Sequence, residues 1–254
     1  MITSVCFSVT SAPHMVSKIE HTAPYLKRRL RELADPEFRE SQQRFSKEPL
    51  RTLGVRTPEL RKLAMAAAKE YRRSGLSFDD ILEIAERIWR RGALEERGLA
   101  IDILSRFQRH LEPRHWGHFD KWVDSLSNWA ETDGLCLGLL APLLKQRPAL
   151  VKRLRAWTRS PHRWRRRAAA AALVPLARHG EQHEAAFDIC DRLAEDRDDM
   201  VEKAIGWLLK EVSRTQPQAV ADYLLDNIER LSRTTVRYAC EKLPARLRKR
   251  VMSA

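Results

Sequence analysis

The sequence predicts an all-α protein whose helices form a HEAT-like repeat solenoid, and two observations carry this prediction. Glycine and proline separate helical patterns of about 12–18 residues, and pairs of such helices recur about every 35–45 residues. No stretch shows the sustained period-two alternation of β-branched residues that is typical of a strand. Because the repeats share little sequence, a compact irregular helical bundle remains the alternative.

The predicted helix starts follow capping chemistry. Thr57-Pro58-Glu59 supplies the N-cap and the first two positions of a helix that runs to about Tyr71. Ser77-Phe78-Asp79-Asp80 begins the next helix. Asn128-Trp129-Ala130-Glu131 has the form of a capping box with asparagine as the cap. The apolar stretch 135–144 that follows predicts a buried helix.

The second half of the chain continues in the same way. Ser160-Pro161 is predicted to start an arginine-rich helix. Asp198-Asp199 then places two acids at the positive end of the dipole of a further helix.

The charge of the chain points to an anionic partner. Its 254 residues include 47 Lys+Arg and 34 Asp+Glu, a formal net charge of +13, and nucleic acid is the leading candidate. An evenly basic, solvated surface is the alternative. Between Val151 and Arg167 there are eight bases and no acid, with Trp157 and Trp164 among them, which indicates a folded run suited to phosphate: Lys152, Arg153, Arg155, Arg159, Arg163, Arg165, Arg166 and Arg167.

Three tryptophans lie near single charged residues in the sequence. Residues three or four apart share one face of a helix. The spacing therefore pairs Trp129 with Asp133, Trp164 with Arg167, and Trp207 with Lys203.

Trp207 lies away from the predicted core stripe of its helix, which consists of Val201, Ala204, Ile205, Leu208 and Val212. Gly206 lowers helix stability by roughly 1 kcal/mol, and it lets another group approach the backbone. Packing of Trp207 against a neighbouring repeat is the alternative to ligand contact.

Asp133 lies in the opening turns of the buried helix, where the helix dipole stabilises its anion. A salt-bridging aspartate would have the same position. Trp129, one turn earlier, favours a functional role.

The arginine-rich helix has Trp164, Ala168, Ala171 and Pro175 along one stripe, with Arg167 beside it. Arg165 and Arg166 are expected to fan outward. The run Ala168–Ala172 lets another helix come close. We expect phosphate contact from these arginines, with a solvated basic face as the alternative.

Other chemistries lack their residues. His110, His115 and His118 are expected to be solvated, because no cysteine or acid pair completes a metal site. The four cysteines form no CxxC pair and fit a reducing cytoplasm. No apolar run is long enough for a membrane span. Phosphate-binding-loop, dinucleotide-binding, zinc-protease and nucleophile-elbow motifs are missing.

Several blocks together resemble the AlkD-type DNA alkylation repair family. They are Leu53-Gly-Val-Arg-Thr-Pro-Glu-Leu-Arg61, Asn128-Trp129 with Asp133, Trp164-Arg-Arg-Arg167-Ala-Ala and Lys203-Ala-Ile-Gly-Trp207-Leu-Leu-Lys-Glu211. Leu231-Ser-Arg233 is similar to the family's C-terminal motif.

The resemblance implies a HEAT-like solenoid with a basic concave face around duplex DNA. It implies a monofunctional glycosylase that removes cationic N3- and N7-alkylated purines without a metal or cofactor. It makes Asp133 the catalytic aspartate, Trp129 and Trp207 its paired tryptophans, and Arg167 a phosphate contact. We further expect DNA binding by Arg163, Arg165, Arg166, Lys203, Lys210 and Arg233, and a monomer in the bacterial cytoplasm at the nucleoid.

The chemistry of the residues agrees with this implication. An N3- or N7-alkylated purine is already positive, so its departure needs no general acid. The sugar that it leaves is oxocarbenium-like, and a fixed anion at Asp133 would stabilise that charge and orient a water. Trp129 and Trp207 would offer electron-rich faces to a cation.

Two residues depart from the family pattern. Ala130 follows the tryptophan where family members have an acid, and Phe45 stands in place of a tyrosine. Both bear on the substrate range, and the sequence does not distinguish 3-methyladenine, 7-methylguanine and bulky adducts. A non-catalytic HEAT-repeat protein that binds damaged or branched DNA is one competing hypothesis, and a protein–protein scaffold is another.

The domain prediction places an N-terminal extension at residues 1–18, disordered or due to start-site choice, before one glycosylase domain over residues 19–254. Met15 is an alternative start.

Overall fold

The structure, a computed structural model, describes residues 20–45 and 48–254, and within them it contains helices and no β-strand. The predicted extension and the side chain of Phe45 lie outside this description. The principal helices are α1 (Ala23–Glu32), α2 (Pro36–Phe45), α3 (Thr57–Arg73), α4 (Phe78–Trp89), α5 (Leu94–Ser105), α6 (Trp116–Asp124), α7 (Trp129–Leu135), α8 (Ala141–Gln146), α9 (Val151–Trp157), α10 (Arg163–Ala171), α11 (Val174–Arg178), α12 (His183–Leu193), α13 (Asp199–Val212), α14 (Pro217–Asp226), α15 (Arg233–Ala239) and α16 (Ala245–Met252).

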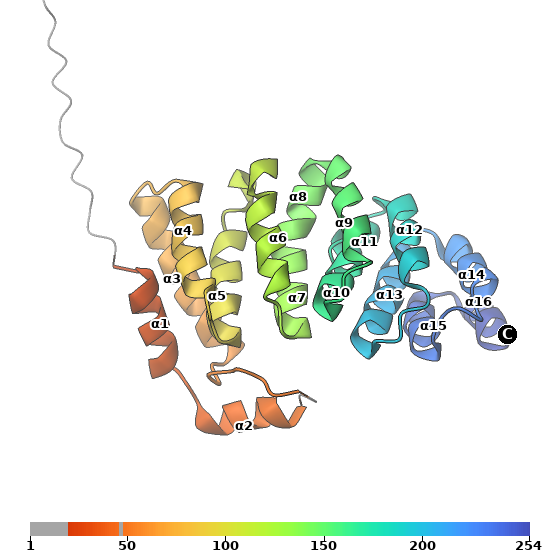
Figure 1. The fold of residues 1–254 in the computed structure, drawn as a ribbon, viewed down its shortest axis with the longest axis horizontal. Helices are drawn as coiled ribbons and strands as arrows, with labels where there is room; N and C mark the ends of the chain where they lie inside the picture. The colour runs from red at the N-terminus through yellow and green to blue at the C-terminus, as the bar shows by residue number, and fades with distance from the viewer. Residues whose placement is uncertain (1–19, 46–47) are drawn as a thin grey trace, which may run out of the picture.

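The helices stack side by side along the molecule in chain order (Figure 1). One row, here called the main row, consists of α3, α5, α7, α10, α13 and α15, each packed against the next. Further helices pair with this row, as α4 does with α5, α9 with α10 and α12 with α13. The predicted all-α helical-repeat architecture is therefore confirmed.

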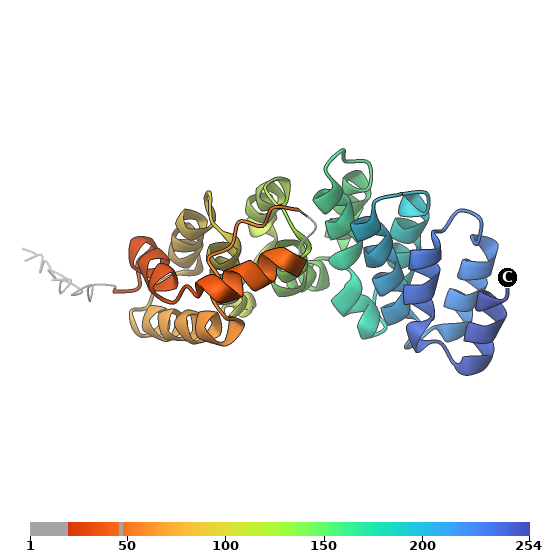
Figure 2. The same cartoon turned by 90° about the horizontal axis from the view of Figure 1, so that it is seen from below.

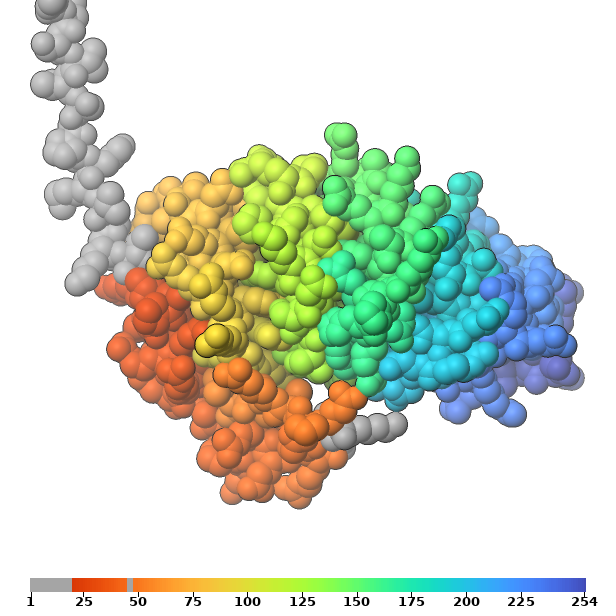
Figure 3. Space-filling model, in the orientation of Figure 1, coloured from red at the N-terminus to blue at the C-terminus, as the bar shows by residue number. Residues whose placement is uncertain are grey.

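Helix α2 belongs neither to the main row nor to the helices that pair with it. It lies across the repeat helices rather than along them, as the view from below makes plain (Figure 2). In the space-filling view, α2 projects beyond the lower edge of the stack (Figure 3). Glu48 reaches Arg163 of α10, 115 residues away in sequence.

Three of the predicted helix starts are confirmed by cap geometry. The side chain of Ser77 accepts a hydrogen bond from the Asp80 amide at 3.2 Å at the start of α4. The side chain of Asn128 accepts a hydrogen bond from the Glu131 amide at 2.9 Å at the start of α7. The side chain of Asp198 accepts one from the Met200 amide at 2.9 Å at the start of α13. All three contacts join residues two or three apart, which is why sequence alone predicts them.

Three predicted boundaries differ from the structure. Arg56, not Thr57, is the cap of α3. The arginine-rich helix begins at Arg163 rather than at Ser160-Pro161, because 158–162 form a turn that divides the basic run between α9 and α10. A π-helical turn, Cys136–Leu140, interrupts the predicted buried helix between α7 and α8.

His115 contradicts the prediction that the three histidines are solvated. His115 is 1% exposed, and its ring accepts a hydrogen bond from the Glu112 amide at 2.9 Å and lies 3.1 Å from the Asp79 carboxylate. His110 and His118 are exposed as expected. The difference arises because His115 packs against Phe78, which lies 37 residues away in sequence.

The alanine run of α10 confirms the predicted close approach. Ala168–Ala172 are fully buried, and α10 packs along α13. Trp164, at the other end of this stripe, is also buried and belongs to the hydrophobic core.

Gly206 provides the closest approach in the main row. A Cβ atom there would lie 2.5 Å from the Cβ of Tyr238 and 2.8 Å from the carbonyl oxygen of Thr235, both on α15. The group that approaches this glycine is therefore the next helix of the same chain.

Gly206→Ala is expected to lower the free energy of unfolding by about 1–3 kcal/mol, because α15 must move away from α13. Urea unfolding followed by circular dichroism measures this change. Gly117→Ala is the matched control: it is exposed, and its Cβ would meet nothing within 4 Å, so it should be neutral or stabilising by up to about 1 kcal/mol. Equal effects of the two substitutions would contradict the close approach.

Candidate functional site

Four successive helices of the main row place the predicted site residues around one recess. It has a volume of about 360 Å³. The recess is lined by Trp129 and Asp133 of α7, Arg167 of α10, Met200, Lys203, Trp207 and Lys210 of α13, and Tyr238 of α15. The residues that the sequence proposed as the catalytic centre are thus brought together, although 78 residues separate the first from the last.

Hydrogen bonds with neighbouring residues fix the start of α7. Glu131 is 3% exposed and accepts hydrogen bonds from the Ser127 amide at 3.0 Å and from Arg97 at 2.7 Å. Asn128 caps the same turn. These contacts fix the first turn of α7, which carries Trp129 and leads to Asp133 one turn later. Trp129 itself is 56% exposed, an unusual position for a tryptophan unless something binds over it.

Arg167 holds both oxygens of the Asp133 carboxylate. Its Nε donates to Oδ1 at 2.9 Å and its Nη2 to Oδ2 at 2.7 Å, the bidentate geometry that fixes a carboxylate most strictly. The remaining nitrogen of the guanidinium also has a partner, since Nη1 donates to the carbonyl oxygen of Met200 at 2.6 Å. One guanidinium therefore connects α7, α10 and the start of α13.

The Asp133 side chain is mostly withdrawn from water, with 18% of its surface exposed. Burial raises the pKa of this carboxyl above the usual range of an aspartate, and the hydrogen bonds and charge of Arg167 oppose that rise only in part. The Asp133 carboxyl is therefore more basic than a surface aspartate.

Helix α13 supplies the opposite side of the recess. Trp207 is half-buried: it lines the recess and also packs partly against the core. Lys203 lies 3.5 Å from Asp199 of its own helix, and Lys210 lies 2.9 Å from Glu241. Both ion pairs are partly exposed, so exchanging a carboxylate for a phosphate at either lysine costs little.

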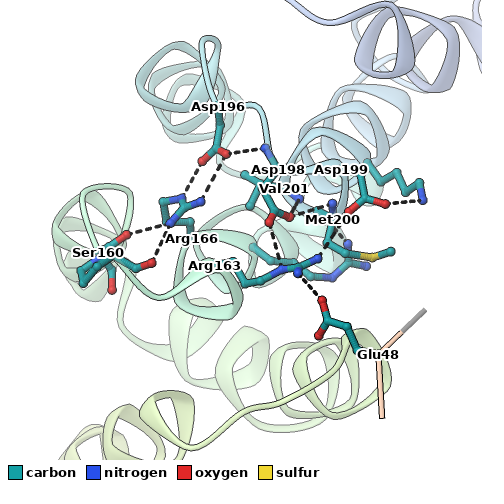
Figure 4. A network of polar contacts seen from close by, with 12 residues as sticks. Glu48, Ser160, Arg163, Arg166, Asp196, Asp198, Asp199, Met200 and Val201 are labelled. Atoms are coloured by element: carbon teal, nitrogen blue, oxygen red, sulfur yellow. Dashed lines mark hydrogen bonds and ion pairs between the residues drawn. The ribbon is translucent and has the colours of Figure 1, made fainter. Parts of the chain in front are cut away.

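Three arginines of α10 do not point where the sequence suggested. Arg165, expected to fan outward, bonds Asp120 at 2.8 Å and Asp124 at 2.7 Å on α6. Arg166 bonds Asp196 at 2.6 Å (Figure 4). Their side chains are only 15% and 19% exposed, so the expectation that they fan outward is wrong.

Arg163 is surrounded by carboxylates. It bonds Glu48 at 2.5 Å, Asp198 at 2.9 Å and Asp199 at 3.3 Å (Figure 4). Like Arg165 and Arg166, Arg163 forms ion pairs that join separate segments of the fold. The acids come from distant parts of the sequence, because the basic run itself contains none. Of the predicted DNA-binding residues, Arg233 is exposed at the start of α15, and Lys203 and Lys210 line the recess.

The sequence missed two residues of the recess. Met200 contributes its carbonyl to Arg167 and lines the wall, and Tyr238 adds a third aromatic side chain. No local pattern marks either of them. The one sequence feature connected with Tyr238 is Gly206, which its Cβ approaches closely. The sequence shows that some group can approach this glycine, and the structure shows that the group is on α15.

A larger groove of about 1030 Å³ adjoins the recess. It shares Trp129, Met200 and Lys203 with the recess, and Ala130 and Trp164 also line it. Trp129 therefore lines both the recess and the larger groove.

Comparison with known proteins places these features in context. Residues 26–243 match the family described as DNA alkylation repair enzyme. A predicted DNA alkylation repair enzyme from Enterococcus faecalis has a similar structure, with a TM-score of 0.74 and 18% identity over 84% of this chain and 97% of that one. No curated protein sequence matches this chain.

Two structures from Streptococcus mutans are also similar. AlkD2 has a TM-score of 0.56 and 17% identity over 87% of this chain and all of its own, 100%. The protein smu.31 of strain UA159 has a TM-score of 0.50 and 17% identity over 87% of this chain and 99% of that one. At these identities the likeness shows a shared fold.

None of the helices in residues 20–45 and 48–254 combines the length and apolar character needed to cross a membrane.

Proposed function

Because the chain belongs to the DNA alkylation repair enzyme family, we propose that it is a monofunctional glycosylase that hydrolyses the N-glycosidic bond of cationic N3- and N7-alkylated purines in duplex DNA. One observation carries the proposal: a mostly buried carboxylate, Asp133, opens into a recess between two tryptophans. On this proposal the protein acts as a monomer, without a metal or cofactor, at the chromosome in the bacterial cytoplasm.

The reaction is a hydrolysis at C1′ of the damaged nucleotide. The C1′–N bond breaks with its electron pair going to the purine, which leaves as a neutral alkylpurine. Positive charge then develops on the sugar, where the Asp133 anion stabilises it. Water adds to C1′ and gives up a proton, which Asp133 is placed to accept.

Arg167 acts in this scheme as a positioning residue. The resemblance assigned it to a phosphate, but its side chain is 7% exposed and its hydrogen bonds go to Asp133 and Met200. Because it binds one edge of the carboxylate, the remaining lone pairs are left for the sugar and water. Phosphate contacts are better served by Lys203 and Lys210, which line the recess, and by Arg233, which is exposed at the start of α15.

A single-turnover assay on a duplex with one 7-methylguanine tests the proposal. The protein should release free 7-methylguanine far faster than buffer alone, and should release no guanine from the undamaged duplex. Tight binding to the damaged duplex without release would instead establish the competing hypothesis, a non-catalytic binder of damaged DNA. Neither binding nor release would favour a protein–protein scaffold.

Trp129→Ala should lower excision by about two- to thirtyfold, the loss of one cation–π contact, while changing unfolding free energy by less than about 0.5 kcal/mol because Trp129 is exposed. Trp164→Ala is the matched control, since it removes a buried tryptophan and should cost about 3–5 kcal/mol of stability. Denaturant titration and single-turnover excision separate the two effects. A loss of stability with normal excision at Trp129 would return it to a packing role.

Excision should fall with decreasing pH in step with protonation of Asp133. The active form is the carboxylate and burial raises its pKa, so the rate is full above that pKa and declines as the pH falls through it. The acid limb should therefore lie above the usual range of an aspartate. Single-turnover rates, corrected for spontaneous depurination, measure it, with duplex affinity at each pH as the control. A rate that stays constant through this range would exclude Asp133 as the ionising group.

A further inference from the structure

The C-terminal end of the chain carries an unusual share of the positive charge. Residues 231–254 contain seven bases and one acid, so less than a tenth of the chain holds six of its thirteen net positive charges. The acid, Glu241, is paired with Lys210 of α13 at 2.9 Å. Of the seven bases, only Arg233 has a role in the proposed function. All of the others are exposed: Arg237, Lys242, Arg246, Arg248, Lys249 and Arg250.

The stability of α16 does not account for its charges. Leu247 and Val251 form its buried face, and the helix contains no acid. Arg246 lies in the first turn, where the helix dipole disfavours a cation, and Lys249 is a like charge on the same face three residues later. The last repeat of a solenoid needs a polar outer face for solubility, but that face does not need a single sign of charge. The single sign therefore indicates an anionic partner.

Helix α16 lies at the C-terminal end of the stack (Figure 1). It packs against α14 and against the 3₁₀ turn Cys240–Lys242 that follows α15. Arg250 faces α14, where it bonds Asp222 at 3.2 Å. Arg248 lies on the opposite flank, and its charge opposes part of the rise that burial causes in the pKa of the Cys240 thiol. Arg248 is therefore on the side of α16 toward α15, which is the last helix of the main row.

Within residues 20–45 and 48–254, Arg250 is the one member of this group of six that forms an ion pair. The other five form what we call the C-terminal basic patch: Arg237, Lys242, Arg246, Arg248 and Lys249. We propose that this patch binds the phosphate backbone of duplex DNA beside the damaged nucleotide, independently of base sequence and of damage. Helix α16 lies beyond residues 26–243, which match the family, so this surface is an addition to the matched region.

The position of α16 gives the place of the contact on the duplex. Packed helices lie about 8–10 Å apart, and the phosphates of one strand follow each other about every 3.4 Å. A duplex centred on the recess should therefore meet α16 about three to six nucleotides beyond the damaged one. This inference rests on duplex DNA as the partner, but its test does not rest on catalysis.

The test removes three charges of α16 together, in the variant Arg246→Gln/Arg248→Gln/Lys249→Gln. Its affinity for an undamaged duplex, measured by fluorescence anisotropy at several salt concentrations, should be at least about tenfold weaker than that of the wild type. The slope of log affinity against log salt should fall by about two to three, because each lost phosphate contact removes about 0.9. The charge-keeping variant Arg246→Lys/Arg248→Lys/Lys249→Arg should bind nearly as the wild type does.

Lys152→Gln/Arg153→Gln/Arg159→Gln is the matched control, because it removes the same net charge elsewhere. These three residues are exposed in or just after α9 and line neither the recess nor the larger groove. The control should weaken binding by less than about threefold, since salt screens charges that lie more than about 10 Å from the duplex. Equal losses in the two triple variants would overturn the patch, as would an unchanged salt slope in the α16 variant.

Folding of both triple variants is checked by circular dichroism and thermal melting. If the α16 variant does not fold, Arg246→Gln, Arg248→Gln and Lys249→Gln are measured singly, and each should lower the salt slope by up to about 0.9. Slopes equal to that of the wild type in all three would overturn the proposal.

Excision separates this proposal from the proposed reaction. In single-turnover release of 7-methylguanine, the loss in the α16 variant should appear in the protein concentration that gives half-maximal release and not in the maximal rate. Weaker duplex binding by this variant, in a protein whose wild type releases no 7-methylguanine, leaves the DNA-binding patch and removes the glycosylase. Normal release by the wild type, with unaltered duplex affinity in the α16 variant, leaves the glycosylase and removes the patch.

Discussion

Asp133→Asn should reduce single-turnover release of 7-methylguanine by at least about a hundredfold, while the affinity for the damaged duplex changes little. The amide keeps the size of the carboxylate but loses the negative charge that the oxocarbenium-like sugar needs. It also cannot accept the proton of the attacking water. Release should be measured under single-turnover conditions and affinity by fluorescence anisotropy, both at neutral pH.

Asp188→Asn is a suitable control for this substitution. Asp188 lies on α12, accepts hydrogen bonds from Arg155 at 2.8 Å and Arg192 at 3.0 Å, and does not line the recess. It reproduces the loss of an arginine-paired carboxylate without touching the site. Release by Asp133→Asn within tenfold of wild type would contradict the catalytic assignment.

Arg167→Met should lower the free energy of unfolding by about 3–5 kcal/mol, because it leaves the mostly buried Asp133 carboxylate without its partner. The double variant Asp133→Leu/Arg167→Met should recover most of that loss, since it leaves no unpaired charge. Arg155→Met, at an exposed pair, should cost less than about 1 kcal/mol. Guanidinium chloride unfolding measures all three.

The loss in Arg167→Met should shrink as the pH falls. Without Arg167, nothing opposes the effect of burial, so the folded protein holds the Asp133 proton more tightly than the unfolded chain does. A carboxyl whose pKa is raised by folding binds protons preferentially in the folded state, and stability then rises as the pH falls toward and through that pKa. A deficit that is constant with pH would show that Arg167 stabilises the fold by some means other than pairing Asp133.

What the sequence predicts well is local. Asn128 and Asp198 cap helices through bonds to residues two or three positions away, so their roles follow from short motifs. Trp164 and the alanines that follow share a stripe fixed by helical geometry, and the structure buries them as expected. Helical spacing pairs Trp129 with Asp133, but only the family resemblance joins this pair to Arg167 and Trp207, because no local motif connects the three helices.

What the sequence does not reveal is the direction of long side chains. Arg165 and Arg166 belong to a run without acids, which suggests a surface for phosphate. Their partners Asp120 and Asp196 lie 45 and 30 residues away, on either side of that run. An arginine can reach several neighbouring helices, so its partner is decided by the stacking of the repeats rather than by its own position.

The chain of contacts through Arg167 has a mechanical consequence. One guanidinium joins α7 through Asp133 and the start of α13 through the Met200 carbonyl, while its own backbone belongs to α10. Any tilt between these three helices therefore moves the Asp133 carboxylate relative to Trp207. For the proposed glycosylase, the stiffness of the stack is therefore part of catalysis, and a substitution buried between these helices should slow excision without altering any residue of the recess.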